Sequence, residues 1–258
     1  MEKQDNGTEQ FIPELYSELR QSIIKMPKVI KKASGIQIYG KLIKSIIYSM
    51  DVAVIANNDA DAILAVYPWT PNTRILSAIS TVSQVPILAG IGGGLTSGNR
   101  SSRLGSFAEE HGAFGVVLNG PCDLDTIGIV NETVDIPIIY TVVNDKRNLQ
   151  ELIDNGVDIF NVAGGKETTN LVRWVREQFP EFPIIASGGQ NDEQILSTIE
   201  AGANAITYTT YGKTEKYFQE KNGTISKVIK QLFTKRRLES RCLFCFIFKS
   251  KCFLSEVF

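Results

Sequence analysis

Eight short apolar runs, spaced almost evenly along the chain, constrain its fold more than any other feature. Their starts lie 19, 23, 29, 22, 22, 25 and 21 residues apart, and the runs cover 43–48, 62–67, 85–90, 114–118, 136–142, 158–162, 183–187 and 204–209. Stretches with helical periodicity, such as "NLQELIDNG" and "DEQILSTIEAGA", lie between them. Continuous apolar strands that alternate with amphipathic helices are typical of parallel strands buried on both faces.

The number and regularity of these units predict how the sheet closes. A doubly wound open sheet usually has five or six strands and a longer switch-over connection, whereas eight regular βα units close into a barrel. We therefore predict an α/β protein with a (β/α)8 barrel, or TIM barrel, over about residues 40–234. The first unit is the weakest, because "DVAVIANND" (51–59) has to serve as its short helix.

The segments that flank the predicted barrel do not follow its period. Residues 13–32 are expected to form one or two basic amphipathic helices, broken at Pro27, in a helical extension over 1–39. "GIQIYG" (35–40) is predicted to be a strand outside the ring that plugs or borders the barrel. Residues 235–258, rich in Phe and Cys, are predicted to be a tail that contributes nothing to the core.

Composition argues against several classes of protein. The 27 basic and 28 acidic residues give a net charge of −1, which provides no electrostatic footprint for nucleic acid or for an anionic membrane. No run reaches the ~18 apolar residues of a membrane span, and the chain start lacks a signal-peptide pattern. Four cysteines, three of them in the last 17 residues, do not form a disulfide framework. We expect a cytoplasmic protein, and a homo-oligomer stays open.

The C-terminal ends of the strands are where barrels of this type carry their active sites. "IIASGGQNDEQ" (184–194) ends one apolar run in two glycines directly before a helix start. Glycine backbone permits close approach and a helix N-terminus supplies N–H donors, and a phosphate group needs both. We predict a phosphate site, with Asp192 capping the helix, formed by Ser187, Gly188, Gly189, Thr209, Thr210, Gly164 and Gly165. The alternative is a plain turn between strand and helix.

The loop after the third apolar run is the longest and richest in glycine. "GIGGGLTSGNRSSR" (90–103) does not satisfy the dinucleotide motif G-x-G-x-x-G, because Leu95 occupies the place of the third glycine. We predict a mobile lid in which Gly93 and Gly94 act as hinges and Arg100 closes on an anion. A solvated flexible loop is the alternative.

Candidate catalytic groups are few. Lys166 follows the sixth run, where a desolvated amine could form a Schiff base or pair with a substrate anion. Asp123 and Asp145 could act as a base or hold Mg²⁺ through water, although each alone is more often a helix cap or a loop charge. The only histidine, His111, is expected to be structural at a helix C-terminus. Cys122 is expected to be a small buried residue, since no histidine is placed to activate it.

Several motifs resemble known barrel families. "PIIASGGQNDEQILSTIEAGANAITYT" (183–209) resembles the last βαβ unit of the phosphate-binding TIM barrels, which include thiamine-phosphate, tryptophan-pathway and ribulose-phosphate enzymes. "AVYPWTP", "GIGGGLTSGNR" and "FNVAGG" are similar to a little-characterised bacterial barrel family whose members are labelled hydrolase or the isoprenoid diphosphate synthase GcpE. The resemblance implies a barrel and an anion site, and it carries over no catalytic residue.

These features predict an enzyme, a lyase, isomerase or hydrolase, that acts on a small phosphorylated metabolite with Lys166 and a carboxylate. The first alternative is a phosphate-ligand-binding barrel without catalysis, which the scarcity of His and paired Glu at strand ends favours. The second is a GcpE-like protein, which needs an iron–sulfur cluster. Cys242, Cys245 and Cys252 form the only thiol cluster in the sequence.

Overall fold

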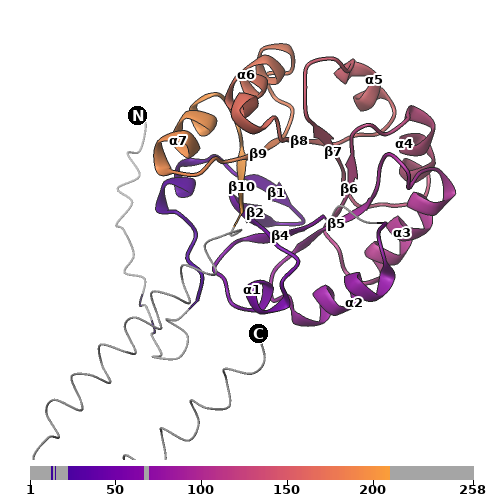
Figure 1. The fold of residues 1–258 in the computed structure, drawn as a ribbon, viewed down its shortest axis with the longest axis horizontal. Coiled ribbons are helices and arrows are strands. Elements are labelled where there is room, and N and C mark those ends of the chain that lie inside the picture. Colours follow the sequence, from indigo (N-terminus) through magenta and orange to yellow (C-terminus); the bar gives the residue numbers. More distant parts are fainter. Residues whose placement is uncertain (1–12, 14, 16–22, 67–69, 210–258) are drawn as a thin grey trace, which may run out of the picture. The chain divides into compact units, whose positions relative to one another are not determined.

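A closed barrel of eight parallel strands forms the body of this computed structural model, which describes residues 13, 15, 23–66 and 70–209 (Figure 1). Each strand overlaps one of the predicted apolar runs, and the ring closes between β10 and β3. The strands are β3 (Ser45–Tyr48), β4 (Ala62–Ala65), β5 (Ile87–Gly92), β6 (Gly115–Asn119), β7 (Ile138–Val142), β8 (Ile159–Val162), β9 (Ile184–Ser187) and β10 (Ala205–Thr209). The predicted (β/α)8 fold is confirmed.

Helices surround the strands as an outer ring (Figure 1). They are α1 (Val52–Ala56), α2 (Thr73–Val82), α3 (Asn99–Glu110), α4 (Leu124–Asn131), α5 (Leu149–Asp154), the 3-10 helix η2 (Gly165–Glu167), α6 (Thr168–Gln178) and α7 (Asp192–Glu200). The short helix expected in 51–59 is α1, where the Asp51 side chain accepts a hydrogen bond from the Ala53 N–H. No helix in the described part of the chain is long and apolar enough to cross a membrane.

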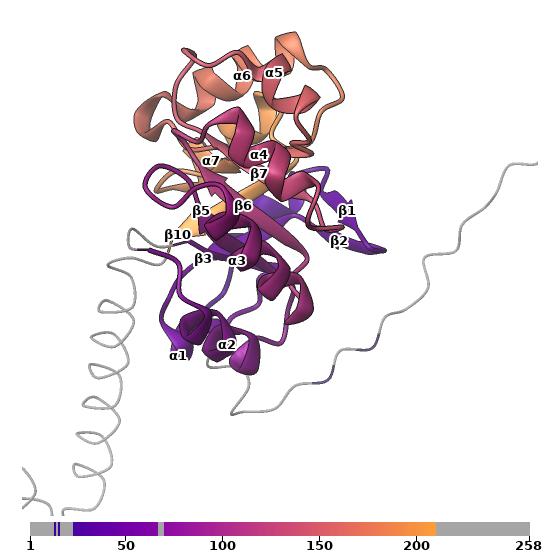
Figure 2. The same ribbon diagram turned by 90° about the vertical axis from the view of Figure 1, so that its right-hand side faces the viewer.

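The "GIQIYG" segment forms a hairpin with the residues after it, outside the ring as predicted. β1 (Ile36–Ile38) pairs antiparallel with β2 (Lys41–Ile43), and the two form a separate sheet. Figure 2 shows the hairpin at one end of the barrel. Ile36, Ile38 and Ile43 are buried in one cluster with side chains of the barrel interior. The hairpin therefore plugs this end.

The predicted N-terminal helices are only partly present in the described residues. Lys28–Lys32 form the 3-10 helix η1. The helical prediction for 23–27 is wrong, because Ile24 instead bridges to Asn58 in parallel and its N–H donates to the Asn57 carbonyl at 2.9 Å. Residues 1–12, 14, 16–22, 67–69 and 210–258 lie outside the described residues, and so do the predicted end of the barrel (210–234) and the tail.

Side chains along each barrel strand alternate between an outer core under the helices and an inner core inside the barrel. Besides Ala62 of β4, the inner core contains one buried apolar side chain from each strand. We call this set the lower ring, and it consists of Ile46, Leu64, Leu88, Val117, Ile139, Ile159, Ile185 and Ala205. Because the hairpin isoleucines join the same cluster, the lower ring and the hairpin close the barrel with apolar packing.

Polar residues just before the strands satisfy the backbone at the N-terminal end of the barrel. Asp61 Oδ2 accepts from the N–H groups of Lys44 and Ser45 at 3.0 and 2.8 Å. Asp158 Oδ2 accepts from the Ile138 N–H at 2.8 Å. These side chains replace ladder partners that the strand starts lack.

Candidate functional site

A second ring of inward-facing positions lies two residues beyond the lower ring, at the C-terminal mouth of the barrel. Because side chains alternate along a strand, these positions face the interior again. We call them the upper ring, which consists of Tyr48, Val66, Gly90, Asn119, Thr141, Asn161, Ser187 and Thr207. Six of these eight residues carry polar side chains, whereas the lower ring has none. The polar ring lies at the end where barrels of this fold bind their substrates.

Three neighbouring strands contribute a hydrogen-bonded row to the upper ring. Asn119 on β6 is in register with Thr141 on β7, which is in register with Asn161 on β8. The Thr141 hydroxyl donates to Asn119 Oδ1 at 3.0 Å, and Asn161 Nδ2 donates to the Thr141 hydroxyl at 3.2 Å. The register of the parallel strands therefore places three polar side chains side by side inside the barrel.

Two oxygens of the upper ring are buried and lack a hydrogen-bond partner among the described residues. They are Asn161 Oδ1 and Thr207 Oγ1, on side chains that are each 6% exposed. Leaving a buried acceptor unpaired costs about 1–3 kcal/mol, so such atoms normally meet a water or a ligand. Thr207 is in register with Ser187 on β9 and Ile46 on β3. The unpaired oxygens identify the upper ring as the candidate binding site.

Of the upper ring, only Ser187 is among the site residues predicted from the sequence, where it belongs to the phosphate site. Thr141 is not among them. The signal was present in the apolar runs themselves, where "YTV" and "FNV" place one polar residue between apolar ones near the strand end. In a strand buried on both faces, such a residue faces either the helices or the barrel interior. It faces the interior when it lies two positions after a residue of the lower ring, because side chains alternate along the strand.

Close packing accounts for Gly188, the first glycine of the predicted phosphate turn. Its N–H donates to the Thr207 carbonyl at 3.0 Å, which continues the pairing of β9 with β10. This N–H is therefore not available to an anion. A Cβ at this position would overlap Ile206 Cγ2 and lie 3.1 Å from Ile195 Cγ1. Only glycine fits between these two side chains.

The second glycine, Gly189, turns the chain with a φ of +85°, which L side chains rarely adopt. A Cβ there would lie 2.6 Å from Gln194 Cβ. Gln194 Oε1 accepts from the Gln190 N–H at 2.7 Å, and Asn191 Oδ1 accepts from the Gln194 N–H at 2.9 Å. Asn191 therefore caps α7, and the expectation that Asp192 would do so is wrong. The exposed Gly189 N–H is the donor of this turn with no partner among the described residues.

The remaining residues of the predicted phosphate site lie on neighbouring loops. Ser187 is half-buried at the end of β9, and Thr209 is exposed at the end of β10, while Thr210 lies outside the described residues. Gly164 and Gly165 begin η2, directly after β8. Because β8, β9 and β10 are adjacent in the barrel, the loops after β8 and β9 and the end of β10 are neighbours at one side of the mouth. Phosphate binding by them stays a prediction.

The predicted catalytic residues lie at the mouth, but no hydrogen bond or ion pair among the described residues joins them. Lys166 is exposed in η2, and Asp145 is exposed after β7. Asp123 caps α4, where its Oδ1 accepts from the Thr126 N–H at 2.6 Å. Hydrogen bonds from Thr126 hold the pKa of the Asp123 carboxyl below its usual range. Asp123 is therefore ionised at neutral pH, and one of its carboxylate oxygens is used to cap α4.

Cys122 and His111 have structural surroundings, as expected. Burial, with Asp123 nearby, raises the pKa of the Cys122 thiol to about 11, so the sulfur is protonated at neutral pH and a poor nucleophile. His111 follows the last residue of α3, and its ring stacks on Phe107 with centroids 3.9 Å apart. The C-terminal end of α3 leads into β6, so His111 lies at the opposite end from the mouth.

The glycine-rich loop after β5 is tied to the neighbouring loop after β6. The Gly93 N–H donates to the Thr96 carbonyl at 2.9 Å, and the Gly94 N–H donates to the Pro121 carbonyl at 2.7 Å. The Gly98 N–H donates to the Thr126 hydroxyl at 2.8 Å. Both glycines proposed as hinges are thus held by hydrogen bonds. Arg100 is exposed in the first turn of α3, and its contact with an anion stays a prediction.

The described residues contain no preassembled cluster of metal-binding side chains, and Mg²⁺ binding stays a prediction. Within 23–66 and 70–209, no group of three or more His, Cys, Asp or Glu side chains could hold a metal ion. Mg²⁺ is usually bound through one or two carboxylates together with waters and substrate phosphate. Asp123 is engaged in its cap, and no contact joins it to Asp145. The thiols proposed for an iron–sulfur cluster, Cys242, Cys245 and Cys252, lie outside the described residues.

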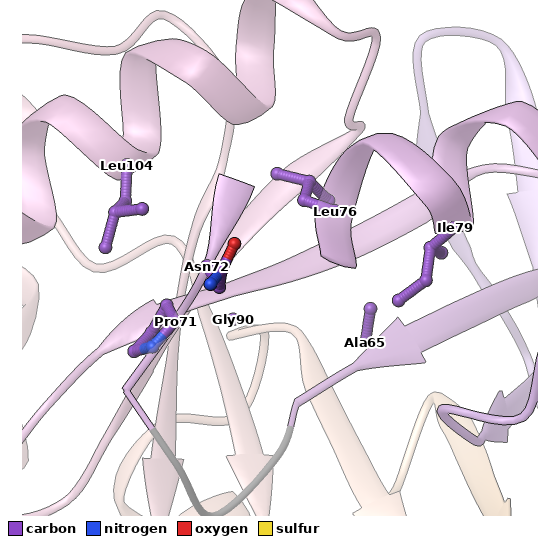
Figure 3. A pocket seen from close by; sticks show the side chains of 7 residues that line it. All are labelled: Ala65, Pro71, Asn72, Leu76, Ile79, Gly90 and Leu104. Atoms are coloured by element: carbon purple, nitrogen blue, oxygen red, sulfur yellow. The ribbon is translucent and has the colours of Figure 1, made fainter. Parts of the chain in front are cut away.

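Two hollows in the described structure are lined by neither Asn161 nor Thr207. Figure 3 shows one outside the barrel wall, where Leu76 of α2 and Leu104 of α3 approach from different helices; it is lined by Ala65, Pro71, Asn72, Leu76, Ile79, Gly90 and Leu104. The other measures about 340 Å³ at the N-terminal end, beside Asp59 and Asp61. Asp59 forms an ion pair with Lys25 at 3.7 Å, and Asp61 accepts hydrogen bonds from the N–H groups at the start of β3. Neither hollow offers unpaired buried polar atoms like those of the upper ring.

The comparisons with known proteins concern the fold. No protein-family model matches the sequence. Phosphoenolpyruvate phosphomutase from Streptomyces platensis subsp. rosaceus matches with a TM-score of 0.56 and 11% identity, over 87% of this chain and 93% of that one. Phosphonopyruvate hydrolase in complex with oxalate and Mg²⁺ matches with a TM-score of 0.53 and 12% identity, over 81% and 91%. 4-Hydroxy-tetrahydrodipicolinate synthase from the methanotroph Methylacidiphilum fumariolicum SolV matches with a TM-score of 0.53 and 16% identity, over 79% and 83%.

At identities this low, the likeness establishes the TIM-barrel fold and nothing finer. It agrees with the barrel fold predicted from the sequence. The phosphate-binding branch and the resemblance to GcpE are not confirmed by it.

Proposed function

We propose that this protein is an enzyme that binds a small phosphorylated metabolite at the C-terminal mouth and converts it by lyase, isomerase or hydrolase chemistry. The observation that carries the proposal is the pair of unpaired, buried oxygens in the upper ring, Asn161 Oδ1 and Thr207 Oγ1. Barrel packing does not need polar atoms there, since the lower ring fills the same interior with apolar side chains. A bound substrate gives these atoms partners.

The phosphate group is proposed to lie over the loops after β8 and β9, beside the end of β10. Gly189 offers an unpaired N–H, and Lys166 on the adjacent loop offers a positive charge. Asp192 and Glu193 occupy the first turn of α7, so the helix end alone is a poor anion site. Lys166 is therefore the main electrostatic partner in this proposal. Two of the solved structures with the same fold are named for phosphoenolpyruvate and phosphonopyruvate, which is consistent with such a ligand.

The chemistry is proposed to come from the loops, because the upper ring supplies hydrogen bonds and no strong acid or base. Lys166 either attacks a substrate carbonyl to form a Schiff base or pairs with the anion. Asp145 is the proposed base, as its exposed carboxylate has no partner among the described residues. Asp123 stays ionised and contributes negative charge at the neighbouring loop.

A second candidate function is ligand binding without catalysis. The observation that favours it is the chemistry of the upper ring, where neutral amides and hydroxyls predominate. Such a ring can select a ligand by hydrogen bonds while no group near it moves a proton. The cytoplasm remains the predicted compartment under either function.

The test combines ligand protection with trapping at Lys166. Inorganic phosphate or a phosphorylated sugar should raise the unfolding free energy by RT ln(1 + [L]/Kd), which is about 2.7 kcal/mol at 100 Kd. Lys166→Met should weaken this protection, whereas Lys28→Met, an exposed lysine on η1, should leave it unchanged. If no phosphate compound protects the wild type, the proposed function is wrong.

Borohydride then separates the enzyme from the binding protein. Reduction in the presence of a phosphorylated aldehyde or ketone should attach the ligand to the peptide that contains Lys166, and peptide mass spectrometry detects the adduct. Protection without an adduct or any turnover would favour the binding protein. Turnover that survives Lys166→Arg would remove Lys166 from the mechanism.

A further inference from the structure

The hydrogen bonds of the upper ring run in one direction. The hydroxyl of Thr141 has a single hydrogen, and it donates that hydrogen to Asn119 Oδ1. Asn161 must therefore present its Nδ2 to the Thr141 oxygen. This fixes the amide of Asn161 with its Oδ1 facing away from the row. The unpaired oxygen is thus a pre-oriented acceptor rather than a side chain that happens to lack a partner.

An acceptor of this kind selects the chemistry of its partner. Asn161 Oδ1 needs an O–H or N–H, and Thr207 Oγ1, the second unpaired oxygen, both donates and accepts. A carboxylate or ketone oxygen carries only lone pairs and would face Asn161 Oδ1 with repulsion. Neither ring contains Lys, Arg or His to balance a buried negative charge. The interior therefore suits an uncharged group that can donate hydrogen bonds.

We propose that the part of the substrate that enters the upper ring carries hydroxyl groups, so that the ligand is a phosphorylated polyol or sugar and not a phosphorylated carboxylic acid. This inference rests on the proposed function, because the phosphate end is assigned to the loops after β8 and β9. One substrate hydroxyl donates to Asn161 Oδ1, and another exchanges hydrogen bonds with Thr207 Oγ1. Oxalate, which the matched phosphonopyruvate hydrolase structure contains, is a carboxylate of the class excluded here.

Three probes test the inference by calorimetric titration: inorganic phosphate, glycerol 3-phosphate and phosphoenolpyruvate. Phosphate reports on the loops alone, and the other two add either hydroxyls or a carboxylate. We expect glycerol 3-phosphate to bind at least about tenfold more tightly than phosphate, which is the scale of satisfying a buried acceptor. Phosphoenolpyruvate should bind no more tightly than phosphate.

Variants assign the preference to the ring. Asn161→Leu and Thr207→Val keep the side-chain shape and remove the unpaired oxygens, so each should abolish the tenfold preference while phosphate still binds. Thr81→Val is the matched control, because its hydroxyl lies on the exposed face of α2 and donates to the Ser77 carbonyl. It should keep the preference. If Asn161→Leu fails to fold by circular dichroism, Thr207→Val carries the test.

The outcomes separate the two proposals. Phosphate binding without any gain for glycerol 3-phosphate would mean that water satisfies the ring, which overturns this inference and leaves the proposed function intact. Tighter binding of phosphoenolpyruvate than of glycerol 3-phosphate would overturn the inference as well. If none of the three probes binds, the proposed function fails and the inference fails with it.

Discussion

The lower and upper rings are built from the same eight strands, two residues apart, yet they have opposite chemistry. Every side chain of the lower ring is apolar and buried, and the hairpin isoleucines pack in the same cluster. The upper ring is mostly polar, and two of its buried oxygens are unpaired. The lower ring thus stabilises the fold by apolar packing, whereas the unpaired oxygens of the upper ring lower the stability of the fold. Such local costs are typical of binding sites.

Polar groups at the N-terminal end of the barrel are hydrogen-bonded within the chain, and the only unpaired buried side-chain atom of the described residues outside the upper ring is Arg147 Nε. Arg176 of α6 donates to the carbonyls of Gly202 and Phe182 at 2.8 Å each, and to Asn204 Oδ1 at 2.8 Å. Asp61 accepts three hydrogen bonds from the start of β3. These polar side chains serve the fold and are engaged in hydrogen bonds. The two oxygens of the upper ring, in contrast, have no partner among the described residues and are free to bind a ligand.

The largest effect is expected in the lower ring. Ile139→Ala should lower the free energy of unfolding by roughly 2–5 kcal/mol, because it removes buried apolar contacts and leaves a cavity in a rigid barrel. Urea denaturation followed by circular dichroism measures the change. A loss below about 1 kcal/mol would mean that the interior collapses around the change, and the lower ring would not be the tight core described.

A smaller effect is expected at the mouth, where Asp123 caps α4. Asp123→Ala should cost about 1 kcal/mol at pH 7. The folded-state pKa of this carboxyl is lowered, so its contribution is present above the unfolded pKa of about 3.9 and is lost as pH falls through the folded value. Wild type and variant should therefore converge in stability at acidic pH, below about 4.

Urea denaturation at several pH values tests this contribution of Asp123. Asp145→Ala is the control, because Asp145 is exposed after β7 and does not cap a helix. It should change stability by less than about 0.5 kcal/mol at every pH. A difference between wild type and Asp123→Ala that persists unchanged at low pH would contradict the capping role.

The sequence predicted the barrel well because repeated periodicity is a strong signal. Eight apolar runs with helices between them are compatible with few folds, so the positions of the strands and of the hairpin outside the ring could be predicted. Predictions of helix caps and of single helices were less accurate. Asn191 and Asp192 are both good caps, and what favours Asn191 is its extended backbone together with the hydrogen bond that the Gln190 N–H donates to Gln194 Oε1. The helix expected at 23–27 failed because backbone pairing of Ile24 overrides its amphipathic pattern.

The candidate site was harder to predict than the fold. Sequence reasoning searched for charged residues in loops, and it interpreted the glycine pair at 188–189 through its function. In the structure Gly188 is required by Ile206 and Ile195, which come from the neighbouring strand and from α7. The upper ring consists of neutral side chains whose importance depends on the register between strands. A single strand does not contain that information.

Thr207→Val tests the central claim, that the upper ring is built for a partner and not for stability. The matched control is Thr198→Val on α7, since Thr198 is also buried but its hydroxyl donates to the Gln194 carbonyl at 2.9 Å. The measurement is the free energy of unfolding of both variants in urea, without ligand. We predict that Thr198→Val loses about 1 kcal/mol, while Thr207→Val is as stable as the wild type or gains up to about 1 kcal/mol. A loss at Thr207 equal to that at Thr198 would show that its hydroxyl is already satisfied, which would contradict the account.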